Sequence, residues 1–474
     1  MRQAVEPTPK SSGVFSWWRV LCDALSGKAY DYTQGSLTRA VILLAIPMVL
    51  ETSMESLFAI CDIFWVSKLG EQAMAAVGLT ESVTTLYYAI AIGLSLAATA
   101  MIARRVGEKN QAQAAEAGVQ AIYIGVLLGV LTGVVCWFGA PKILAIMGAS
   151  QEVWEMGTPY MRIVLGCNVV ILMLFLNNAI FRGAGDPAIA MRALWIGNGI
   201  NLVLDPCLIF GWGPFPELGL TGAAIATVIG RGCAVLYQFR ELRRGTSQIR
   251  LTGAVWRWRP ALMLRLVRVA IGGMGQLLIA TTSWVALMRI MAIFGDAALA
   301  GYTIAIRIVI FTILPSWGLA NAASTLVGQS LGAKLPDRAK HAVLLTGVYN
   351  MTFLVAAVMV YWIFGEQLMM MFTQDSTSIE IGKRCLHIIS YGYVLYGWAM
   401  VLTQAFNGAG DTATPTLLNF LACYCVQLPL AWILSQTLRM GPDGVFWAVM
   451  VSDALLMVLA WVAFYRGAWM GRDI

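Results

Sequence analysis

Long stretches of apolar residues run through nearly the whole chain, and they constrain its fold more than any other feature. About 20 consecutive apolar residues suffice for a helix to cross a bilayer. Only 12% of the 474 residues are charged, against about 25% in a soluble protein. The sequence therefore predicts an all-α membrane protein with twelve transmembrane helices, near residues 38–66, 73–103, 113–138, 152–182, 187–212, 217–243, 261–294, 298–330, 338–365, 376–407, 412–437 and 443–466.

The distribution of basic residues predicts the orientation of these helices. If the N-terminus is cytoplasmic, most of the 32 lysines and arginines fall on the cytoplasmic side, as membrane proteins prefer. The largest group lies in residues 240–268. We therefore expect a multi-pass protein of the inner (plasma) membrane with both termini in the cytoplasm. We also expect it to be a monomer. Topology explains the basic segment without a nucleic-acid partner.

Residues 1–37 form a polar N-terminal tail in which Val14–Leu25 can be an amphipathic helix. In that helix Trp17, Trp18 and Leu21 would face lipid, while Arg19 and Asp23 would face water. Such a pattern is typical of a helix lying on the membrane surface. A partly ordered tail is the alternative.

The two halves of the chain repeat each other at an offset of 225 residues. Gly93-Leu94 corresponds to Gly318-Leu319, and Gly183-Ala184-Gly185-Asp186 to Gly408-Ala409-Gly410-Asp411. The offset becomes 222 in the sixth span. We expect six-helix bundles at 38–243 and 261–466, a cytoplasmic linker at 244–260 and a C-terminal tail at 467–474, with a pseudo-two-fold axis along the membrane normal. In each tetrad Gly permits a sharp turn and Asp can cap the next helix.

Four polar residues in the N-terminal half have aliphatic counterparts in the C-terminal half. A carboxylate near the bilayer centre costs about 2.5–3.5 kcal/mol on insertion scales, and such residues usually mark ion pathways. These side chains can bind a proton or supply oxygen ligands to Na⁺. The alternative is that the two aspartates pair with an interior arginine such as Arg231. The predicted coupling residues are Asp62, Asn201, Asp205 and Thr227. Their counterparts in the C-terminal half are, in the same order, Leu287, Val426, Leu430 and Val449.

The first two spans contain further acidic and aromatic residues. Helical periodicity places Glu51, Glu55, Phe58 and Asp62 on one face of the first span, with Pro47 close by. Such a face can line a cavity for lipophilic organic cations, because aromatic rings and carboxylates attract them. The alternative is ion pairing within the bundle or exposure to a water-filled vestibule. The second span adds Glu81, Tyr87 and Tyr88 to the predicted cavity.

No motif for enzyme chemistry is found in the sequence. His-Glu-x-x-His and Gly-x-Ser-x-Gly are both absent. The nine cysteines fit free thiols inside the spans better than a zinc site or a disulfide framework. We therefore expect no enzyme activity and no cofactor other than a coupling ion.

Two segments resemble the MATE (multidrug and toxic compound extrusion) transporters, namely LAIPMVLETSMESLFAICDIFWVSKLGEQAMAAVGL and FRGAGDPAIAMRALWIGNGINLVLDPCLIFG. The resemblance is greatest to the prokaryotic branch with acidic residues in the N-terminal half. It implies a V-shaped pair of bundles that exports small organic molecules in exchange for H⁺ or Na⁺. It also implies that the first span bends near Pro47, a candidate hinge. The alternative function is a lipid-linked saccharide flippase of the same superfamily, although its anionic pyrophosphate substrate would favour a cationic cavity.

Overall fold

The computed structural model describes residues 13–28, 30–245, 249–251 and 256–472, and these residues fold into helices joined by short turns. The N-terminal half contains α2 to α8, and the C-terminal half contains α9 to α15. The helices are α1 Gly13–Ser26, α2 Leu37–Ser67, α3 Glu71–Gly107, α4 Gln111–Ile146, α5 Gln151–Gly166, α6 Asn168–Ala184, α7 Pro187–Phe210, α8 Leu220–Arg244, α9 Pro260–Met291, α10 Asp296–Gly332, α11 Pro336–Met370, α12 Ser376–Gly408, α13 Ala413–Phe420, α14 Leu428–Trp432 and α15 Pro442–Arg466.

Among the described residues, twelve helical segments are long and apolar enough to cross a membrane, as the sequence predicts. Helices α5 and α6 form one segment, and α13 and α14 form another together with the π-helical turns Leu421–Gln427 and Ile433–Thr437. The largest boundary error is in the third segment, which ends at Ile146 rather than at residue 138. The helix continues through Pro141, because neighbouring helices in a membrane bundle can compensate for a hydrogen bond lost to proline.

Two equivalent contacts relate the halves. A Cβ atom added at Gly93 of α3 would lie 2.6 Å from the carbonyl oxygen of Ala270 in α9. A Cβ atom added at Gly318 of α10, its counterpart in the repeat, would lie 2.6 Å from the carbonyl oxygen of Met48 in α2. Only glycine permits either approach. The helix pairs α3–α9 and α10–α2, which correspond in the repeat, therefore approach each other equally closely, as the pseudo-two-fold relation requires.

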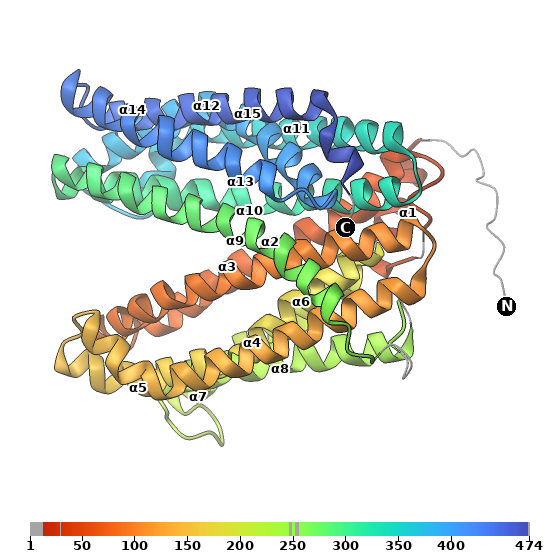
Figure 1. Ribbon diagram of the computed structural model, residues 1–474. Helices are drawn as coiled ribbons and strands as arrows, with labels where there is room; N and C mark the ends of the chain where they lie inside the picture. Colours follow the sequence, from red (N-terminus) through yellow and green to blue (C-terminus); the bar gives the residue numbers. More distant parts are fainter. Residues whose placement is uncertain (1–12, 29, 246–248, 252–255, 473–474) are drawn as a thin grey trace.

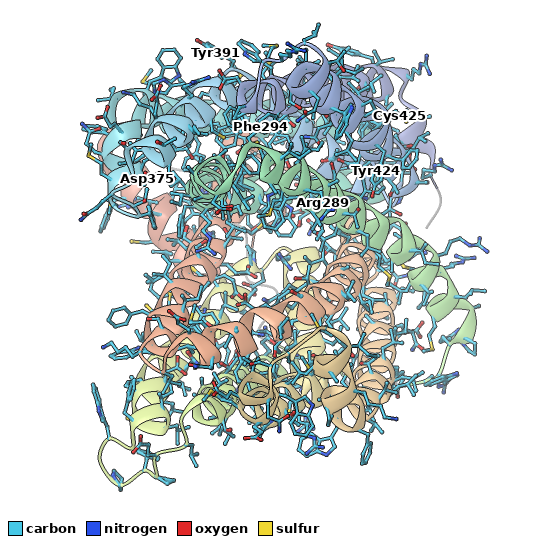
Figure 2. The ribbon with its side chains drawn as sticks, turned by 90° about the vertical axis from the view of Figure 1, so that its left-hand side faces the viewer. Arg289, Phe294, Asp375, Tyr391, Tyr424 and Cys425 are labelled. Atoms are coloured by element: carbon cyan, nitrogen blue, oxygen red, sulfur yellow. The ribbon has the colours of Figure 1, made fainter. Side chains whose placement is uncertain are left out.

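The two bundles form a V (Figure 1). They meet at the right-hand end, where α1 lies, and diverge toward the left. Figure 2, viewed from the left, shows the bundles apart, with the labelled residues Phe294, Asp375 and Tyr424 in the C-terminal bundle. At the closed end, α10 donates two hydrogen bonds to the end of α6 in the other half: Thr325 Oγ1 to the Arg182 carbonyl at 3.1 Å and Gln329 Nε2 to the Gly183 carbonyl at 3.1 Å.

The N-terminal segment crosses the closed end and touches both halves. Helix α1 packs beside α2, and Asp23, expected to face water, pairs with Arg39 at 2.6 Å. The Tyr32 hydroxyl donates to the Gly185 carbonyl at 3.0 Å. Arg338 of α11 donates to the carbonyls of Tyr32, Gln34 and Gly35 at 2.8–3.0 Å. We call residues 30–36 the strap.

The two Gly-Ala-Gly-Asp segments form the sharp turns that the sequence predicts, but only one of the two aspartates caps the following helix. Gly185 and Gly410 have φ angles of +85° and +83°, which favour glycine. Asp411 accepts from the Thr414 amide at 3.4 Å, as a capping residue does. Asp186 caps nothing, and its Oδ1 is buried without a partner. Burial raises the pKa of Asp186 to about 7, against the charge of Arg192, which lowers it.

Candidate functional site

A cavity of about 700 Å³ lies between the bundles and is lined mainly by the N-terminal half. This volume suits a drug-sized molecule. Glu51, Glu55, Phe58 and Asp62 all line it from α2, as their helical spacing predicts. The lining also includes Glu81 and Tyr88 of α3, Asn178 and Arg182 of α6, Thr227 and Arg231 of α8, and Leu277, Ile310, Trp317 and Asn321 of the C-terminal half.

Three of the four predicted coupling residues form a hydrogen-bonded cluster between α7 and α8. The Asn201 amide nitrogen lies 3.2 Å from Asp205 Oδ1 and 3.2 Å from Thr227 Oγ1. Asp205 is fully buried, and its Oδ2 has no hydrogen-bond partner. An unpartnered carboxylate oxygen at this depth can bind a proton or a cation, because leaving it charged and unsolvated costs free energy.

Asp62, the fourth predicted residue, lies in the cavity wall rather than within this cluster. Its charge acts on Asp205, so the two carboxylates are neighbours. Asp62 and Thr227 line the cavity, whereas Asn201 and Asp205 lie behind its surface. An ion arriving through the cavity therefore meets Asp62 first.

Two arginines compensate part of the acidic charge. Glu51 is 6% exposed, accepts a hydrogen bond from Asn178 Nδ2 at 3.0 Å and lies 4.0 Å from Arg182. Arg231 lies 3.7 Å from Glu55. In the described part of the chain neither Asp62 nor Asp205 makes a salt bridge within 4.0 Å. The Arg231 guanidinium group is nevertheless close enough for its charge to act on Asp62, so the alternative that Asp62 pairs with Arg231 stays open.

Tyr87 was predicted to line the cavity, and this is wrong. It is buried on the side of α3 that faces α4, where its hydroxyl lies 3.0 Å from the Cys136 sulfur. Adjacent helical residues point about 100° apart, so Tyr88 faces the cavity while Tyr87 faces the bundle core.

Asn178, Arg182 and Asp453 are intramembrane polar residues that the sequence did not single out. Asn178 and Arg182 lie one helical turn apart and contact Glu51, a spacing that Asn201 and Asp205 share. Asp453 lies near the middle of α15 in the C-terminal half, close enough for its charge to act on Tyr396. At the offset of 222 its counterpart is Arg231, so extending the repeat comparison to basic residues would have found it.

The predicted Na⁺ site stays a prediction. Within the described ranges no three His, Cys, Asp or Glu residues come together as a metal site. The donors near Asp205 are instead one carboxylate, an amide and a hydroxyl, with Asp62 close by. Hard oxygen donors of this kind suit an alkali cation as well as a proton. Pro47 lies within the continuous helix α2, so its role as a hinge also stays a prediction.

Two pseudo-symmetric membrane bundles around a drug-sized cavity define a transporter and not an enzyme. The model of the MatE family matches residues 47–207 and 274–433, once in each half. The chain therefore belongs to the MatE family.

Several relatives named as multidrug proteins match almost the whole chain. A probable multidrug resistance protein NorM of Thermotoga maritima is 25% identical over 92% of this chain and 94% of its own length. A probable multidrug resistance protein YoeA of Bacillus subtilis is 25% identical over 93% and 96%. The multidrug export protein MepA of Staphylococcus aureus is 22% identical over 92% and 95%.

Solved structures of MATE transporters also match the fold over almost the whole chain. One is described as the outward-facing conformation of a multidrug resistance MATE family transporter, with a TM-score of 0.87, 25% identity and coverage of 93% of this chain and 98% of that chain. A MATE structure in the bent conformation has a TM-score of 0.85 and 25% identity, covering 94% and 98%. The chain is thus a multi-pass membrane protein of the multidrug efflux type.

Proposed function

We propose that this protein exports lipophilic organic cations in exchange for H⁺ or Na⁺. The observation that supports this most is the charge of the cavity. Four carboxylates line it, from Glu51, Glu55, Asp62 and Glu81, against the two guanidinium groups of Arg182 and Arg231. The apolar remainder of the wall suits a lipophilic substrate.

We propose Asp62, Asn201, Asp205 and Thr227 as the coupling site. Asp205 is buried with one unpartnered oxygen, and Asp62 lies at the cavity surface beside it. An ion that neutralises these carboxylates removes the attraction for a cationic substrate. Such mutual exclusion is reciprocal, so substrate entering from the cytoplasm also releases the ion.

In this proposal the protein lies in the inner (plasma) membrane and both termini are cytoplasmic. The open end of the V then faces outward, because the two bundles diverge away from the end where α1 lies (Figure 1). In this state the ion enters from outside and substrate leaves. Bending of α2 near Pro47 would shrink the cavity, and rocking of the halves would return the ion to the cytoplasm.

Efflux from proteoliposomes under separate pH and sodium gradients tests the proposal. The purified protein should move a cationic dye against its gradient under one of these gradients, and neither a neutral nor an anionic dye should replace it. Transport that needs no ion gradient would refute coupling. Binding of pyrophosphate lipids in preference to organic cations would favour the flippase instead.

A further inference from the structure

The guanidinium group of Arg231 lies on the cavity wall among a carboxylate, a hydroxyl and an aromatic ring. Its Nη2 donates a hydrogen bond to the Tyr88 hydroxyl at 3.3 Å and lies 3.7 Å from Glu55 Oε1. Its central carbon lies 5.7 Å from the centroid of the Phe58 ring. A carboxylate, a hydroxyl and an aromatic face are the groups that bind a planar delocalised cation. All four residues line the cavity.

These contacts are loose for an arginine that is only 8% exposed. At 3.7 Å the pair with Glu55 is too long for a charge-assisted hydrogen bond, which is typically about 2.7–2.9 Å. Lys383 and Glu366 on the outer surface approach to 2.7 Å by comparison. The Glu55 side chain is 36% exposed, so a molecule in the cavity can reach it. Another cation can therefore replace Arg231 without leaving the carboxylate unpaired.

We propose that Arg231 is a tethered competitor that holds the binding site of the substrate's cationic group until an aromatic amidinium, guanidinium or iminium ion displaces it. This inference rests on the proposed export of organic cations and names the site and the cation class. The entering cation pairs with Glu55 in place of the guanidinium group, which stays tethered in the cavity beside its other carboxylates. A neutral or anionic molecule would leave Glu55 and Arg231 as they are, so the competitor also selects against them.

A competitor of this kind lowers the apparent affinity of the transporter. The apparent dissociation constant equals the intrinsic one divided by the fraction of molecules in which the site is free. Weak retention of substrate is useful to an exporter, because the returning guanidinium group helps to expel the cation once the cavity opens outward. Removing the charge of Arg231 should thus tighten binding and slow release.

Binding of ethidium, a fluorescent aromatic cation, to the purified full-length protein in lipid nanodiscs tests this inference. Arg231→Gln should bind ethidium about tenfold more tightly, as expected if the site is free in about a tenth of wild-type molecules. Arg231→Lys keeps a tethered charge but not the planar delocalised group, so its affinity for ethidium should lie between those of wild type and Arg231→Gln. Arg162→Gln is the matched control: Arg162 is an intramembrane arginine of α5 outside the cavity lining, and its replacement should leave affinity unchanged.

Tyr88→Phe provides a second test that removes no charge. It deletes the hydroxyl that holds Arg231 and keeps the ring, so the guanidinium group is displaced more easily. Ethidium should then bind about threefold more tightly, because its charged ring nitrogen carries no hydrogen to donate to that hydroxyl. Wild-type binding with no gain in either Arg231→Gln or Tyr88→Phe would overturn the competitor role alone. Failure of wild type and both variants to bind ethidium would overturn the cationic substrate as well. Loss of an anionic dye in Arg231→Gln would show that the arginine recognises anions, and would also overturn it.

Discussion

Removal of two hydrogen bonds at the closed end of the V should open that end measurably. Thr325 and Gln329 of α10 are at most 2% exposed and donate to the Arg182 and Gly183 carbonyls of the opposite half. The variant Thr325→Val with Gln329→Leu keeps the volume of both side chains and deletes both donors. The bonds join the two halves, so the variant weakens the closed end without weakening either bundle.

The magnitude follows from the two bonds. Each contributes about 1 kcal/mol, so their loss should shift the equilibrium between the closed and open forms of this end by about 2 kcal/mol. That corresponds to a factor of roughly 30. A resting ratio of open to closed molecules of about 1:99 would rise to about 1:3.

Spin labels across the closed end measure this ratio. Gln111 of α4 and Asp337 of α11 are exposed, lie in different halves and can be changed to labelled cysteines, after the exposed Cys22 and Cys425 are replaced by serine. Electron–electron distance measurements should show a long-distance population that grows in the double variant.

The matched control is Thr346→Val. Thr346 is as buried as Thr325, but its hydroxyl donates to the Ala342 carbonyl within its own helix. This control should leave the distance distribution unchanged. A double variant with the wild-type distribution would refute the reasoning that these bonds hold the end closed.

Three further predictions concern single residues. Asp62→Asn and Asp205→Asn should each abolish uphill efflux in proteoliposomes, and the double variant should be little worse than either, whereas Leu287→Met should transport near normally; normal uphill efflux by folded Asp62→Asn would contradict the coupling role. Tyr87→Phe should transport at the wild-type rate because Tyr87 faces α4, and a loss of ethidium efflux would contradict this placement. Asp186 has a pKa raised from 3.8 to about 7, so the folded state holds a proton that the unfolded state releases, and stability falls as pH rises through that window. Asp186→Asn should therefore melt at a higher temperature than wild type at pH 8 and at the same temperature near pH 3, and equal melting at pH 8 would contradict the burial of this carboxylate.

The sequence predicted the bundles well because hydropathy and the repeat record the constraints that a bilayer imposes. Apolar length gave the twelve spans, and the 225-residue offset agrees with the paired contacts of Gly93 and Gly318. Helical periodicity also placed Glu51, Glu55, Phe58 and Asp62 on the cavity wall correctly. Local patterns of this kind need no knowledge of how distant helices meet.

Contacts between helices were not predictable in the same way. The ion pair between Arg231 and Glu55 joins residues 176 positions apart, and no local pattern selects Glu55 over Asp62 as its partner. The predicted orientation of Tyr87 was wrong because residue type alone does not reveal which side of α3 faces the core. Asp453 did not stand out because only polar residues of the N-terminal half were compared with their counterparts, and Asp453 lies in the C-terminal half.

The strap also sets a condition on how the chain is made. Its carbonyls bind Arg338, which lies 303 to 306 residues further along the sequence. At a synthesis rate of about 5–20 residues per second, the ribosome needs roughly 15 to 60 s to reach that arginine after the strap has emerged. During this interval the strap residues must wait with their carbonyls bound to water. The strap is therefore completed only after the second bundle has begun to assemble, so its hydrogen bonds mark a late step in biogenesis although the residues that bind Arg338 are synthesised at least 303 residues before it.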